Sequence, residues 1–114
     1  MANLRTRFWV SLAMGALFWI PVLALAAMPE YTVAIKGHRF DPAELKVPAN
    51  TKIKLVVDNQ DASAEEFESY ELNREKVVAA KAKITVFIGP LKAGSYKYFG
   101  DFHKDTAQGV ITVQ

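Results

Sequence analysis

At 114 residues the chain is the size of one domain, and a β-sandwich is an economical way to bury a core of that size. It contains no cysteine, which excludes disulfides, thiolate nucleophiles and cysteine-ligated zinc or iron-sulfur sites. Its formal net charge of +2 comes from Arg5 and Arg7; without residues 1–26 there are 12 basic and 12 acidic side chains, so no nucleic-acid partner is expected.

An export leader is predicted at the N-terminus. A head with two arginines is followed by residues 8–27, which carry no charge and end in small residues, as secretory signal peptides do. Cleavage after Ala26 is favoured and cleavage after Ala27 is the next choice, which makes residues 27–114 a periplasmic domain. The uncharged run is also long enough for an uncleaved membrane anchor, but Pro21 breaks a helix there and favours cleavage.

Short stretches of alternating hydrophobicity, separated by turn residues, run through the rest of the chain. Their spacing of roughly 8 to 12 residues is typical of an all-β, Greek-key antiparallel β-sandwich. Residues 74–83 fit a strand or a short helix, and Pro42 makes residues 37–42 a turn. The expected strands are residues 31–36, 44–47, 53–59, 65–72, 85–88, 95–99 and 109–114.

Tyr96 has two interpretations. In the pattern Leu91-x-x-Gly94-x-Tyr96 it resembles a tyrosine corner, in which a phenol bonds to the backbone a few residues upstream in a Greek key. The alternative is a tyrosine that simply packs in the core. The sequence does not separate the two.

Three polar loops are predicted at one end of the sandwich. If the strands run up and down between two ends, the loops at residues 37–43, 59–65 and 100–108 fall together. Both histidines of the chain, His38 and His103, lie in these loops. We therefore expect the histidines to share one end of the molecule with several acidic residues.

Histidine nitrogen and carboxylate oxygen suit copper(II), zinc or iron, whereas the missing thiolate excludes a blue-copper centre. Glu66 and Glu68 point to one face by strand alternation, and together with Glu65 they repel one another, which a bound cation would relieve. The sequence therefore predicts a metal site. Its candidate ligands are His103, His38, Glu65, Glu66, Glu68 and Asp101.

Each candidate also has a plainer explanation. His103 would be a solvated loop histidine, and His38 an ordinary turn residue. Glu66 and Glu68 would form a solvent-facing side of a strand whose other side is buried. Asp101 would only form a turn.

From Tyr31 onward the chain resembles the cupredoxin family. Residues 96–108, Tyr-Lys-Tyr-Phe-Gly-x-x-His-x4-Gln, are similar to the copper loop Tyr-x-Phe-x-Cys-x2-His-x4-Met. Residues 40–48, Phe-x-Pro-x-x-Leu-x-Val-Pro, are similar to the opening Phe-x-Pro-x-x-Ile-x-Val-Pro. Residues 59–67 look like the segment that brings in the first copper histidine.

The resemblance implies roles for four residues. His103 matches the second histidine ligand and Gln108 stands at the axial methionine, where glutamine can serve. Gly100 replaces the cysteine and Glu65 replaces the first histidine. With two of four ligands lost, a mononuclear blue-copper electron carrier is excluded.

Glu66-Phe67-Glu68, followed by Leu72-x-Arg74-Glu75, resembles the exported cupredoxin-like components of bacterial high-affinity ferrous-iron uptake systems. That resemblance implies copper, with iron as substrate or second ion, and a ferroxidase-type activity. The implied partners are a membrane iron permease and other exported iron-uptake components; no small organic substrate is expected. The alternatives are a periplasmic metal-binding or chaperone module without redox turnover, and a structural sandwich with a decayed site. Completion of the site by a homodimer stays open.

Overall fold

The computed structural model describes residues 13–19 and 28–114. Most of the predicted leader, including both cleavage positions, lies outside the described residues, so the signal peptide stays a prediction. Among the described residues, no helix has the length and hydropathy of a membrane span.

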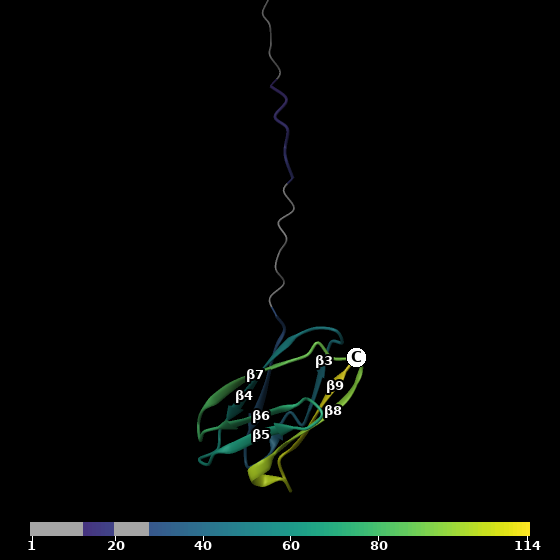
Figure 1. Cartoon of the computed structure of the whole chain (residues 1–114). Coiled ribbons are helices and arrows are strands. Elements are labelled where there is room, and N and C mark those ends of the chain that lie inside the picture. Colours follow the sequence, from purple (N-terminus) through teal and green to yellow (C-terminus); the bar gives the residue numbers. More distant parts are fainter. Residues whose placement is uncertain (1–12, 20–27) are drawn as a thin grey trace, which may run out of the picture.

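In the described part of the chain, nine strands form two facing sheets (Figure 1). The first sheet has the order β2-β1-β4-β7, with β1 Glu30–Ile35, β2 Phe40–Asp41, β4 Ile53–Asn59 and β7 Lys83–Ile88. The second has the order β3-β9-β8-β5-β6, with β3 Glu44–Val47, β5 Glu65–Ser69, β6 Arg74–Val78, β8 Gly94–Gly100 and β9 Gln108–Val113. A 3-10 turn, η1 Asp101–His103, follows β8.

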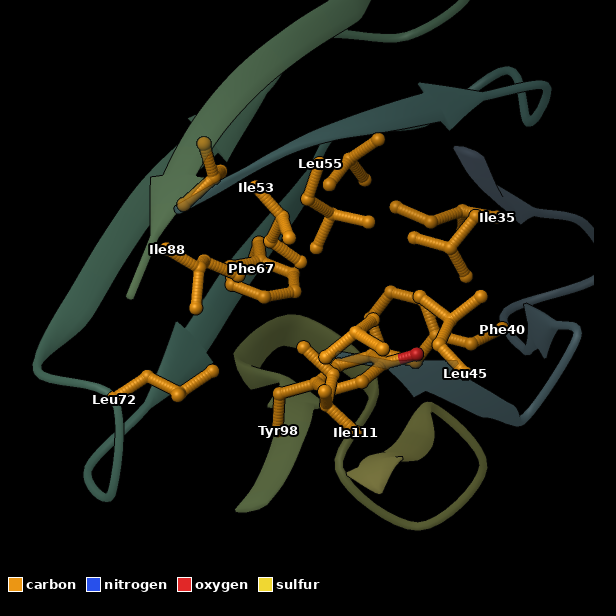
Figure 2. Close-up of a cluster of buried hydrophobic side chains, with 14 of the residues drawn as sticks. Ile35, Phe40, Leu45, Ile53, Leu55, Phe67, Leu72, Ile88, Tyr98 and Ile111 are labelled. Atoms are coloured by element: carbon orange, nitrogen blue, oxygen red, sulfur yellow. The ribbon is translucent and has the colours of Figure 1, made fainter. Parts of the chain in front are cut away.

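The core lies between the two sheets and follows the predicted alternation. Along β4, Ile53, Leu55 and Val57 are buried while the residues between them are partly exposed. They face Phe67 and Tyr98 of the second sheet, which are fully buried (Figure 2). Each such side chain stabilises the fold by roughly 1.5–3 kcal/mol through burial.

The predicted sandwich is confirmed, but its strand pairing is mixed rather than purely antiparallel. β1 runs parallel to β4, and β3 runs parallel to β9. In both cases the partners are distant in sequence, so the chain crosses between the sheets before pairing. The other pairs, such as β4 with β7 and β8 with β9, are antiparallel.

Of the two alternatives for residues 74–83, the strand is confirmed: they form strand β6, a turn and the start of β7. Two other predicted boundaries were wrong. The expected strand at residues 65–72 ends at Ser69, because Ser69 Oγ donates to Lys97 O and accepts from Leu72 N, which holds a turn. The predicted turn at residues 37–42 contains the short strand β2.

Tyr96 forms the tyrosine corner. Its hydroxyl donates to the carbonyl oxygen of Lys92, four residues upstream, at 2.9 Å. The ring is half-buried beside the core and closes the turn before β8. This contact fixes the connection that leads from the first sheet into β8.

The three polar loops do meet at one end of the sandwich. β1 and β4 end there because they run parallel, and β5 starts where the antiparallel β8 ends. In Figure 1 this end carries η1 and lies opposite the chain's C-terminus. The prediction that both histidines share one end is confirmed by their direct contact.

Candidate metal centre

The two histidines form a stacked pair at this end of the sandwich. Their ring centroids are 3.6 Å apart and the ring planes differ by 15°. Both side chains stay partly exposed, His38 at 44% and His103 at 30%. They border a shallow depression of about 530 Å³ whose lining also includes Asp101 and Asp105.

Asp61 holds the ring of His38 over the ring of His103. The Asp61 carboxylate accepts from the backbone N–H groups of Gly37 and His38, at 2.8 and 2.9 Å, and lies 3.5 Å from His38 Nδ1. These contacts support the left-handed backbone of His38, which has φ 57°, a conformation that histidine adopts more readily than most residues. The His38 N–H is the largest of the causes that lower the pKa of Asp61 below its usual range.

Glu65 lies beneath His103. Its Oε2 is 2.6 Å from His103 Nδ1, and only 1% of the side chain is exposed. Oε1 accepts from the backbone N–H groups of Glu66 and Phe102, at 2.9 and 2.8 Å. Both carboxylate oxygens are therefore in contact with polar groups of the protein, so Glu65 supports the histidine; it is not among the residues that line the depression.

The Glu65 carboxylate depends on Gly100. A Cβ added at Gly100 would lie 2.6 Å from Glu65 Cδ and 2.6 Å from Ala107 Cβ, closer than such carbons approach in proteins. The backbone of Gly100 is extended, with φ −94° and ψ 112°, so space and not backbone conformation requires glycine here.

Three other predicted ligands gather on the outer face of the second sheet. Glu66, Glu68 and Asp101 each offer an oxygen, and these oxygens lie within 4.8 Å of one another. We call them the outer acidic cluster. Because the intervening Phe67 is buried, Glu66 and Glu68 must point outward. Asp101 also lines the depression beside the histidines and pairs with Lys104 at 3.1 Å, so it joins the cluster to the histidine pair.

Gln108 is not brought to the histidines. Its amide donates to Lys104 O, and its side chain borders a different depression with Lys97 and Val110. It lies at the start of β9, where Ile111 and Val113 are buried, so the even-numbered Gln108 points outward.

The donor set does not fit a blue-copper centre, because there is no thiolate and Glu65 fills the space beside Gly100. A metal ion binds imidazole along a nitrogen lone pair, in the plane of the ring. Two rings stacked 3.6 Å apart and nearly parallel cannot both hold one ion in their planes. The donors that fit a metal are one imidazole nitrogen, such as His103 Nε2 on the side of the ring away from Glu65, together with carboxylate oxygen. These donors suit copper(II), zinc or iron.

The outer acidic cluster makes folding depend on pH. A hydrogen bond to Glu75, then burial and repulsion by Glu75, Asp101 and Glu68, raises the pKa of Glu66 from 4.5 to about 7. Between these values the folded state binds more protons than the unfolded one, so stability falls as pH rises through the window. Glu66→Gln should flatten this slope in denaturant unfolding between about pH 5 and about pH 8. Glu30→Gln, at an exposed position, is the control and should keep the wild-type slope of stability against pH. An unchanged slope in Glu66→Gln would contradict the raised pKa of Glu66.

Sequence reasoning missed how three residues build this end. The buried Asn59 side chain donates to Ser63 O and Ala79 O and accepts from Asp61 N, which shapes the loop carrying Asp61. Glu65 was grouped with its acidic neighbours although it shares strand parity with buried Phe67. That parity was a signal that Glu65 points inward.

The chain belongs to the cupredoxin-like domain family, whose model matches residues 10–113. Among known proteins it is similar to RP394 of Rickettsia prowazekii (strain Madrid E). The two are 50% identical over 84 residues, which are 74% of this chain and 67% of that protein.

The fold is similar to several solved structures. The metal-binding domain of the Cu(I)-exporting P-type ATPase CopA of Streptococcus pneumoniae D39, with Cu(I), matches with a TM-score of 0.67 and 13% identity, over 75% of this chain and 84% of that one. Auracyanin A, a "blue" copper protein from Chloroflexus aurantiacus, matches with a TM-score of 0.63 and 18% identity, over 75% and 98%. Amicyanin from Paracoccus versutus gives 0.59 and 17%, over 78% and 83%. At these identities the likeness establishes the cupredoxin fold.

Proposed function

We propose that this is an exported copper- and iron-binding protein of ferrous-iron uptake, with a thiolate-free site at the histidine end. The observation that carries the proposal is the stacked histidine pair, in which Nδ1 of His103 contacts the carboxylate of buried Glu65. Imidazole ligands of metals commonly bond through their second nitrogen to a carboxylate in this way. The neighbouring outer acidic cluster offers hard oxygen ligands to an iron substrate.

In this proposal copper(II) would be held by His103 with carboxylate oxygen from Asp101, one of the two aspartates that line the depression. Bound copper(II) would supply a one-electron acceptor: Fe(II) would become Fe(III) as copper(II) becomes copper(I), and dissolved dioxygen would return the copper to copper(II) for the next turnover. The protein residues contribute charge and position: Glu66, Glu68 and Asp101 favour Fe(III) over Fe(II) because hard anionic oxygen stabilises the higher charge. A membrane iron permease would then receive the iron.

Cu(II) should raise the thermal stability of the protein, and His103→Ala should remove this effect of copper. A ligand that binds only the folded state, at a hundredfold excess over its Kd, stabilises by about 2.7 kcal/mol. Thermal unfolding with and without Cu(II), and separately Fe(II) under anaerobic conditions, measures this, with Glu30→Gln as control. The copper complex should show a weak d-d absorption without an intense thiolate band. Failure of both metals to bind at neutral pH would end the proposal.

The second candidate is a metal-binding or chaperone module without redox turnover. It is favoured by the absence of a thiolate, since imidazole and carboxylate donors can hold a metal without the thiolate that tunes a blue-copper site for electron transfer. Fe(II) oxidation rates separate the two. Acceleration by copper-loaded wild type over copper-treated His103→Ala supports turnover, and equal rates with metal bound support the binding module.

A further inference from the structure

We infer that Glu65 is a positioning residue: it fixes the Nδ1–H tautomer of His103, so that Nε2 is the nitrogen this histidine offers to a metal. The tautomer stands on the geometry of the protein alone. Its consequence for metal binding rests on the proposed function. Glu65, a candidate ligand by sequence, is thereby assigned to hold the ligand and not the metal.

The hydrogen bonds of Glu65 place the proton on the histidine ring. Oε1 accepts from the backbone N–H groups of Glu66 and Phe102. In both contacts Glu65 is the acceptor, and a carboxylate has only acceptors to offer. The 2.6 Å contact between Oε2 and His103 Nδ1 therefore needs its proton on Nδ1, which leaves the lone pair on Nε2.

The Glu65 side chain is closely packed. The side chain is 99% buried, and Gly100 provides the space that its carboxylate occupies. On the other side, His103 is covered by the ring of His38 at 3.6 Å. The ring is therefore held both at its edge, by Glu65, and on one face, by His38. The edge of His103 that carries Nε2 is then the part of the ring that would hold an ion.

Nitrogen-15 NMR of the imidazole rings in the metal-free protein at about pH 8, where histidine is ordinarily neutral, tests the tautomer directly. Wild type should show a protonated Nδ1 and a bare Nε2 for His103. Glu65→Gln keeps the shape of the side chain, and its amide group donates to Nδ1, so the ring should change to the Nε2–H tautomer. Glu30→Gln should leave the wild-type pattern. A bare Nδ1 in wild type, or a ring protonated at both nitrogens, would overturn the inference; the wild-type spectrum decides even if Glu65→Gln does not fold.

A copper titration of the same proteins tests the consequence. Glu65→Gln should weaken Cu(II) binding by roughly 10 to 100-fold, as loss of a partner behind a metal-bound histidine does, while His103→Ala should remove the His103-dependent binding. Equal affinity of wild type and Glu65→Gln would overturn the assignment of Glu65. If no copper binds to wild type, the proposed function fails, whereas the NMR result on the tautomer is unaffected.

Discussion

Replacing Gly100 with cysteine is expected to destabilise the protein and not to create a blue-copper centre. The family pattern has cysteine at this place, but here a Cβ would lie 2.6 Å from both Glu65 Cδ and Ala107 Cβ. Overpacking a core costs about 1–3 kcal/mol and occasionally more. Displacing Glu65 also breaks its hydrogen bonds with His103 and two amides, and leaving buried hydrogen-bonding groups unsatisfied costs about 1–3 kcal/mol, more for a charged group. Together these costs predict a loss of about 3 kcal/mol or more in the free energy of unfolding, measured in denaturant.

Ser95→Cys is the matched control, because Ser95 is exposed on the same strand and its thiol meets no such crowding. It should unfold like wild type. With copper(II), neither variant should develop an intense thiolate absorption at the histidine end. A Gly100→Cys protein of wild-type stability with that absorption would show that Glu65 moves aside easily, against the close packing described above.

Gly109→Ala adds a single methyl group, and we expect it to lower the stability of the sandwich strongly. A Cβ at Gly109 would lie 2.2 Å from Tyr98 Cζ and 2.6 Å from Tyr98 Oη. Tyr98 is fully buried and packs edge-on against Phe40, at 4.8 Å between ring centroids, so its ring cannot shift without disturbing the core. Because the approach is this close, we expect a cost at or above the upper end of ordinary overpacking: a loss of about 3 kcal/mol or more in the free energy of unfolding, measured in denaturant.

The double variant Gly109→Ala with Tyr98→Leu identifies the cause. Tyr98→Leu alone leaves a cavity and costs stability by itself. If the ring is the obstacle, the double variant should lose clearly less stability than the two single variants together, because contacting residues couple. Additive losses would place the strain elsewhere on β9.

The strands and the meeting of the loops could be predicted because alternation and turn residues are local signals. The pairing of β1 with β4 and of β3 with β9 could not, since it joins strands separated by crossings between the sheets. Local patterns alone therefore predicted antiparallel pairing for every strand. The cupredoxin motif was sufficient for the family, which the family match confirms.

The candidate site was only partly predictable. Bringing His38 near His103 followed from topology, and their contact confirms it. Strand parity would have placed Glu65 inward and Gln108 outward, but the stacking of the rings and the hold of Asp61 on His38 depend on side-chain conformations that no pattern encodes. Metal binding by any of these residues stays a prediction.

The shared space between Gly100 and Glu65 also restricts how such a protein can diverge. A cysteine at position 100 and the Glu65 carboxylate compete for the same space, so position 100 cannot gain a side chain while Glu65 stays in place. If a cysteine is to appear at position 100, the side chain at position 65 must become shorter first. In the opposite order, the intermediate protein would have both side chains in one space and would fold poorly. The pair should therefore vary together among descendants of a common sequence.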